Sequence, residues 1–151
     1  MKKLNFSVDI NAPGEKVWDT LWGNDTYGQW TSAFGSEGST AVTDWQEGSK
    51  VLFLGAGGKE GMYSVIDKKQ PNTYIAFKHL GVVKEGKEQP QDEETKKWSG
   101  AMETYTLKEN NGATSLLVTL DATDDFADFF NDTFPKALQK VKDIAESATS
   151  A

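Results

Sequence analysis

The sequence predicts an α+β fold, in which a run of antiparallel strands is followed by one long C-terminal helix. Two patterns predict it. Short alternating segments separated by turn residues fill residues 40–122, and an apolar stripe with helical spacing follows them. The chain has 151 residues, the length of one domain, so we expect residues 1–151 to form a single domain with a real core.

The N-terminal segment predicts one strand and two short helices. Its apolar residues alternate with polar ones at Leu4, Phe6, Val8 and Ile10. Asn11-Ala12-Pro13 ends this strand, and Pro13 suits the first turn of a helix. The spacing of apolar residues then predicts one short helix over Glu15–Trp22 and a second over Thr26–Phe34.

Turn residues divide the middle of the chain into strands. We expect these strands at Thr40–Trp45, Lys50–Leu54, Gly61–Asp67, Thr73–Leu80, Trp98–Lys108 and Thr114–Ala122. Asn110-Asn111-Gly112 is a strong hairpin signal between the last two. The charged segment Lys84–Lys97 is expected to be a solvated loop.

The C-terminal segment predicts a long amphipathic helix that runs to about Ser147. Its stripe consists of Phe126, Phe130, Phe134, Leu138, Val141 and Ala145. Thr123-Asp124-Asp125 offers capping side chains at its start. Pro135 lies inside the stripe, so we expect a kink or a restart there, with Thr133 as a second cap.

The glycine-rich segment Gly55–Gly61 poses the question of a phosphate-binding loop. Such a loop must lead from a strand into a helix, whose N-terminus supplies free N–H groups. Here strands are expected on both sides, and Glu60 stands where either common phosphate motif needs another residue. We therefore interpret the segment as a hairpin turn.

Composition excludes several classes of protein. A net charge of −7 argues against nucleic-acid binding, which needs clustered basic residues. The absence of cysteine excludes disulfides and thiolate sites. Neither a signal peptide nor a membrane span is recognisable, so we expect a cytoplasmic monomer.

The sequence predicts neither a metal site nor a cofactor. Zinc sites draw on several histidines or cysteines, and the chain has only His79. A group of acidic residues near the C-terminal helix lacks the spacing of a calcium loop, and the helix dipole explains acids in a first turn. The group is Asp121, Asp124, Asp125, Asp128 and Asp132.

Four short motifs in the right order resemble those of the SRPBCC (START-like) superfamily. Ile10-Asn11-Ala12-Pro13 with Val17-Trp18 and Trp30 resembles its opening, "I-x-A-P-x-E-x-V-W…W". Trp45–Val51 is similar to "W-x-x-G-G-x-F", with Ser49 in place of the second glycine. The other two are Asp67–Phe77, which resembles "E-x-x-P-x-x-x-I-x-F", and Gly112–Leu116, which resembles "G-x-T-x-L". The branch that the chain resembles is the activator-of-heat-shock-ATPase-homologue group.

This resemblance implies the helix-grip fold. In it a curved antiparallel sheet, here of six to seven strands, wraps around the long C-terminal helix, and two short helices follow the first strand. A mainly apolar cavity is implied between the helix and the sheet. Members of the superfamily bind lipids, sterols or polyketides, and some act as cyclases, aromatases or chaperone activators. Fold alone does not choose among these activities.

The candidate ligand-binding residues combine inward strand positions with the helix stripe. They are Tyr63, Val65, Phe77, His79, Glu103, Tyr105, Leu116, Val118, Phe126, Phe130, Phe134 and Leu138. The stripe can equally be filled core, although the surplus of tryptophan slightly favours a cavity. Tyr63, Tyr105, His79 and Glu103 are the candidate polar anchors.

His79 and Glu103 are the candidates for chemistry. His79 is the only group suited to act as a base near neutral pH, although an isolated histidine more often has a structural role. Glu103 alternates in step with Ala101 and Tyr105, which would direct its carboxylate inward. We favour the alternative, in which Glu103 lies at the sheet rim or pairs with a surface lysine.

These observations favour a protein that binds a small hydrophobic molecule, lipid-, sterol- or polyketide-like. One alternative is a cyclase- or aromatase-like enzyme that uses Glu103 and His79. The other is a chaperone-associated stress-response protein, which would use an exterior surface as its partner site.

Overall fold

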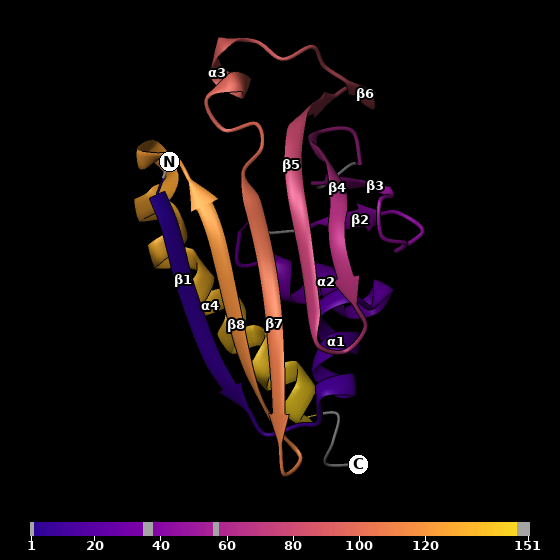
Figure 1. The fold of residues 1–151 in the computed structure, drawn as a ribbon, viewed down its shortest axis with the longest axis vertical. Helices are drawn as coiled ribbons and strands as arrows, with labels where there is room; N and C mark the ends of the chain where they lie inside the picture. The colour runs from indigo at the N-terminus through magenta and orange to yellow at the C-terminus, as the bar shows by residue number, and fades with distance from the viewer. Residues whose placement is uncertain (1, 35–37, 56–57, 148–151) are drawn as a thin grey trace.

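The computed structural model describes residues 2–34, 38–55 and 58–147, and these form one antiparallel sheet with helices against it (Figure 1). In chain order the elements are β1 (Lys2–Ile10), α1 (Gly14–Trp22), α2 (Asn24–Thr31), β2 (Thr40–Val42), β3 (Lys50–Leu54), β4 (Gly61–Gln70), β5 (Tyr74–Lys84), β6 (Lys87–Glu88), α3 (Glu93–Lys96), β7 (Met102–Asn110), β8 (Ala113–Ala122) and α4 (Asp124–Ser147).

Within the described residues the sheet has eight strands, in the order β1-β8-β7-β5-β4-β3-β2, with β6 paired to β5. Every pair is antiparallel, and β1 lies beside β8 along its whole length, from Lys2 opposite Ala122 to Ile10 opposite Thr114. The α+β, helix-grip architecture is therefore confirmed. The short strand β6 was not expected, because Lys87–Glu88 has no apolar alternation.

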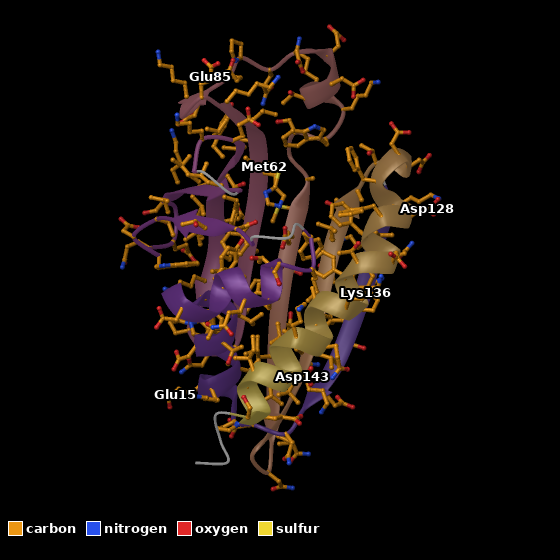
Figure 2. All side chains as sticks on the ribbon, turned by 180° about the vertical axis from the view of Figure 1, so that it is seen from behind. Glu15, Met62, Glu85, Asp128, Lys136 and Asp143 are labelled. Carbon is orange, nitrogen blue, oxygen red and sulfur yellow. The ribbon has the colours of Figure 1, made fainter. Side chains whose placement is uncertain are left out.

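The three longer helices lie on one face of the sheet. In Figure 1, α4 runs obliquely behind β1 and β8, and α1 and α2 lie behind the other half of the sheet. Figure 2 shows this face from the front, with α4 close to α1 at its C-terminal end and further from α2 at its N-terminal end. None of the helices in the described part of the chain is long and apolar enough to cross a membrane.

The core is densest around Trp22, at the end of α1. Its ring lies 4.9 Å from that of Tyr105, 5.3 Å from Phe77 and 5.6 Å from Trp45, between ring centroids. Aromatic pairs at such distances add stability beyond the area that they bury. These contacts join α1 to β5, β7 and the segment before β3, and so fix one end of the helical layer on the sheet.

The hairpin turns form where their residues tolerate positive φ angles. Asn111 and Gly112 have φ angles of 55° and 81°, and the two residues connect β7 to β8 as an Asn-Gly turn. Strands β3 and β4 pair directly, with Leu54 opposite Gly61. The element that follows the glycines is therefore the strand β4, where a phosphate-binding loop would need a helix. Residues 56–57 of the segment lie outside the described residues.

At α4 a restart at Pro135 and capping by Thr133 and Thr123 are not found. Helix α4 continues through Pro135 without a restart, because this proline is exposed and the carbonyl that loses its partner can bind water instead. Thr133 is therefore buried within the helix and does not cap it. The hydroxyl of Thr123 is buried without a hydrogen-bond partner among the described residues, so it does not cap α4 either.

We expect the packing of α4 on the sheet to carry much of the stability. Leu138 on α4 is 2% exposed, and Leu138→Ala should lower the free energy of unfolding by about 2–5 kcal/mol. Leu117, on the outer face of β8, is 40% exposed, and Leu117→Ala should cost about 1 kcal/mol or less. Urea denaturation measures both; equal losses would contradict this description of the core.

Candidate functional site

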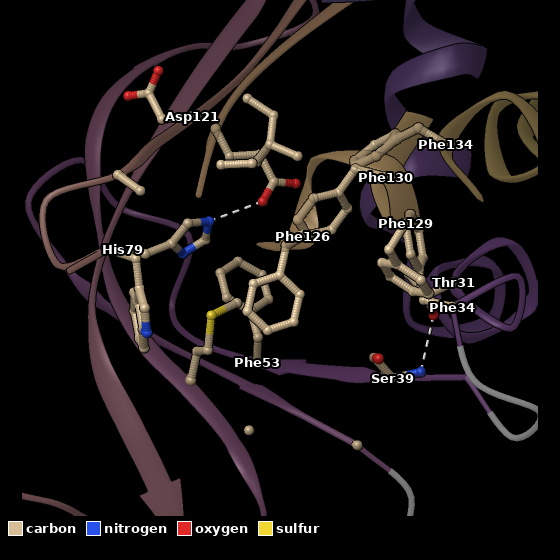
Figure 3. A pocket seen from close by; sticks show the side chains of 18 of the residues that line it. Thr31, Phe34, Ser39, Phe53, His79, Asp121, Phe126, Phe129, Phe130 and Phe134 are labelled. Carbon is tan, nitrogen blue, oxygen red and sulfur yellow. Dashed lines mark hydrogen bonds and ion pairs between the residues drawn. The ribbon is translucent and has the colours of Figure 1, made fainter. Parts of the chain in front are cut away.

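A cavity of about 630 Å³ lies where α4 and α2 diverge over the sheet (Figure 3). Helix α4 contributes one wall, α2 a second, and strands β3, β4, β5, β7 and β8 the floor. Aromatic residues are the largest group in its described lining: Trp22, Tyr27, Trp30, Phe34, Phe53, Trp98, Tyr105, Phe126, Phe129, Phe130 and Phe134. Phe126 and Phe129 are 55% and 45% exposed, so the cavity opens to solvent at the first turns of α4.

A chain of hydrogen-bonded side chains crosses the floor of this cavity. Ser64 on β4 bonds His79 Nδ1 on β5 at 2.7 Å. His79 Nε2 bonds a carboxylate oxygen of Glu103 on β7 at 2.9 Å, drawn as the dashed line from His79 in Figure 3. The Tyr105 hydroxyl donates to the other oxygen of Glu103. Three neighbouring strands thus hold one carboxylate in place.

Backbone pairing fixes the histidine in this chain. The His79 N–H donates to Ala101 O at 2.8 Å, and Gly100 N–H donates to His79 O at 2.7 Å. The imidazole is nearly buried, and both of its nitrogens have partners on adjacent strands. Its orientation is therefore set on both sides, and neither nitrogen is open to a ligand without displacing a partner.

The hydrogen bonds from His79 and Tyr105 hold Glu103 as an anion. Burial raises the pKa of Glu103. The hydrogen bond and charge of His79 and the hydrogen bond from Tyr105 lower this pKa by more, so the net shift is downward. Burial and the charge of Glu103 raise the pKa values of Tyr105 and Tyr27. The phenols therefore stay neutral and the carboxylate stays charged.

Two other polar atoms in the wall have no hydrogen-bond partner among the described residues. They are Trp22 Nε1, a donor, and Thr123 Oγ1, and both atoms are buried. Most buried polar atoms in folded proteins are paired. Two other polar side chains of the wall are paired: Asp121 accepts from Met102 N–H at 3.1 Å, and the Thr31 hydroxyl accepts from Ser39 N–H at 2.9 Å, the second drawn in Figure 3.

The structure brings half of the predicted site residues together around the cavity. Those that line it are His79, Glu103, Tyr105, Phe126, Phe130 and Phe134. Four others are buried in the core and do not line it: Phe77, Leu116, Val118 and Leu138. Their burial is explained by packing under α4 and α1 rather than by a cavity.

Tyr63 and Val65 lie on the other face of the sheet. They alternate with Ser64 and Ile66, which are buried beneath the helices. The Lys50 ammonium lies 5.9 Å from the centre of the Tyr63 ring, on the face away from the cavity. Sequence alternation did not reveal this, because Tyr63 and Val65 are as apolar as their buried neighbours.

The expectation for Glu103 was wrong. Glu103 neither lies exposed at the rim nor pairs with a lysine, since its side chain is 20% exposed and its partners are His79 and Tyr105. The alternation with Ala101 and Tyr105 had pointed inward, and the hydrogen bonds on β5 and β7 explain why the carboxylate can stay there.

Sequence reasoning missed the wall that α1 and α2 contribute. Trp22, Tyr27 and, just after α2, Phe34 are apolar residues that equally suit a filled core. Asp121 was considered only as a possible metal ligand, yet it lines the cavity. Within the described ranges, no three acidic or histidine side chains are close enough to hold a metal ion.

The comparisons identify the family and the fold. Residues 11–143 match the family described as activator of Hsp90 ATPase homolog 1-like protein. The Aha1 dimer of Colwellia psychrerythraea is 23% identical, with 97% of each chain covered and a TM-score of 0.72. A Cytophaga hutchinsonii protein is 22% identical over 100% of this chain and 98% of its own, with a TM-score of 0.71.

A third similar structure is DynU16, a protein of the dynemicin biosynthetic locus. It is 14% identical, with 98% of this chain and 48% of DynU16 covered and a TM-score of 0.70. At these identities the similar structures show the shared fold. No curated protein matches the chain significantly.

We expect Glu103 to make stability depend on pH. Its pKa is lower in the folded than in the unfolded chain, so the stabilisation is complete above the ordinary value of about 4.3 and is lost as pH falls through the folded value. The difference in unfolding free energy between wild type and Glu103→Gln should therefore be larger at neutral pH than in acid.

Urea denaturation at a series of pH values measures this difference, and the exposed Glu85→Gln is the matched control. The difference in unfolding free energy between wild type and Glu85→Gln should stay nearly constant across the pH series. A Glu103→Gln difference that grows as the pH is lowered would contradict the assignment of Glu103 as a stabilised anion.

Proposed function

We propose that this chain, which belongs to the family of activator of Hsp90 ATPase homolog 1-like proteins, binds a small hydrophobic molecule in its aromatic cavity. The observation that carries the proposal is a cavity of about 630 Å³ with aromatic walls and one polar end. Sites for small molecules typically measure about 300–1,000 Å³ and combine apolar walls with a few placed polar groups. A well-packed core leaves no space of this size.

The polar end would orient the ligand. Each oxygen of Glu103 already accepts one hydrogen bond and can accept another, so a ligand hydroxyl or N–H can bind there. A ligand acceptor could also satisfy Trp22 Nε1. A lipid-, sterol- or polyketide-like molecule with an apolar body and a polar end has these features, and the origin of DynU16 in a biosynthetic locus supports a small molecule.

A cyclase-like activity is the alternative that the His79–Glu103 contact favours. General acid–base catalysis needs a group free to exchange a proton with substrate. Both nitrogens of His79 are engaged, by Ser64 and by Glu103, which supports a positioning role for the ring rather than a catalytic one. We therefore propose ligand binding, in preference to catalysis, as the function of the cavity.

If the chain is an enzyme, Glu103→Gln should abolish turnover of a polyketide-like substrate while ligand binding and circular dichroism persist. Turnover that survives in this variant would exclude Glu103 as the catalytic group.

The name of the family refers to activation of a chaperone ATPase, which would use an exterior surface. The feature of this chain that supports a function is internal, a cavity with a charged group held at its floor. For this reason we propose ligand binding rather than chaperone contact.

We expect neutral hydrophobic probes to bind at the aromatic wall. A panel of a sterol, a fatty alcohol and a flavonoid-like aromatic can be titrated while tryptophan fluorescence is recorded, because Trp22, Trp30 and Trp98 line the cavity. Phe130→Ala should weaken the binding of the best probe about tenfold, which corresponds to about 1.4 kcal/mol of lost contact.

Tyr63→Ala is the matched control, since it removes an aromatic ring from the opposite face of the sheet. Its affinity should equal that of the wild type. Equal affinities in all three proteins would place the probe outside the cavity, and a panel with no binding probe would remove the support for this function.

A further inference from the structure

We infer that the cavity selects a hydrophobic molecule that carries a protonated amine over one that carries a carboxylate. This inference rests on the proposed function and names the chemical class of its ligand. It comes from the charges in the cavity wall and from its aromatic faces, which are independent observations.

Among the described residues, the wall carries more acidic than basic side chains. Glu60, Glu103 and Asp121 line the cavity, and no lysine is among the described residues that do so. The chain contains no arginine at all. His79 is the only basic side chain among the described lining residues, and its Nε2 is already bonded to Glu103. A ligand carboxylate would therefore meet no free cationic partner.

Lysines do not neutralise these carboxylates from outside the wall. Within the described residues, the lysine ion pairs reach other acids: Asp124, Glu88, Glu94, Asp132 and Glu146. Asp121 has a backbone N–H as its partner, and Glu103 has His79 and Tyr105. An anionic head group would thus enter a poorly hydrated space next to like charge, which is costly.

The same wall suits a cation. Aromatic faces attract cations, and the attraction grows when the pair is shielded from water. The rings of Trp22, Trp30 and Tyr105 cluster in the wall with centroids 4.9–6.4 Å apart, and the Tyr105 hydroxyl bonds the Glu103 carboxylate. A protonated amine bound there would contact these aromatic rings and a carboxylate acceptor. Its apolar body would lie against the α4 phenylalanines toward the open end.

The test uses three probes that share a ring system and differ in head-group charge: 2-naphthylmethylamine, 2-naphthylmethanol and 2-naphthoate. Isothermal titration calorimetry at neutral pH measures each affinity. We expect the amine to bind most tightly and the carboxylate most weakly, at least about tenfold apart. In Glu103→Gln and Asp121→Asn the ratio of the amine affinity to the carboxylate affinity should fall by at least about threefold, since each variant removes one charge from the wall.

Glu15→Gln is the matched control, because it removes one charge from the exposed surface of α1, and Glu15 does not line the cavity. In Figure 2 Glu15 lies well away from Met62, which lines the cavity. The ratio in Glu15→Gln should equal that of the wild type. Circular dichroism verifies that each variant is folded, and Asp121→Asn alone decides the question if Glu103→Gln does not fold.

The outcomes separate this inference from the proposed function. If the alcohol binds but the amine and the carboxylate bind equally well, the function stands and the charge selection is overturned. An equal fall of the ratio in all three variants would assign the selection to net charge and also overturn it. If none of the three probes binds, the proposed function fails together with this inference.

Discussion

The hydrogen-bonded chain from Ser64 through His79 to Glu103 and Tyr105 is the interaction on which the rest of the site depends. It joins β4, β5 and β7 and keeps a carboxylate inside an aromatic wall. Without these donors, burial would favour the neutral acid or turn the side chain toward solvent. With them, the cavity gains a fixed negative charge at its floor. The orientation of a ligand would follow from this group, and its charge preference from this group together with Asp121 and Glu60.

The cavity exists because the two halves of α4 pack differently. The C-terminal half of the helix packs on the sheet and on α1, where Leu138, Val141 and Ala145 are fully buried. At the N-terminal half, α2 lies further away, and Phe126 and Phe129 remain partly exposed. Trp22 packs against Trp30 and Tyr105, and all three rings line the cavity. The same apolar stripe is thus core at one end and cavity wall at the other.

Periodicity predicted most of the fold, and the reasons for its failures are local. Alternation and turn residues located strands such as Lys50–Leu54, because each pattern is a direct consequence of strand geometry. Alternation could not choose the face for Tyr63 and Val65, and helical spacing could not separate a lining Trp22 from a filled core. Glu103 was directed inward by alternation, but only its partners on β5 and β7 explain why it stays. These partners are distant in sequence and meet through strand pairing.

The most direct test of ligand binding in this cavity is a crystal structure of the chain grown with 2-naphthylmethanol. The ring system should lie between α4 and the sheet, against Phe130 and Phe134, with its hydroxyl within hydrogen-bond distance of Glu103. A probe bound on the outer face of the sheet near Tyr63, or side chains that fill the cavity and exclude the probe, would contradict the central claim.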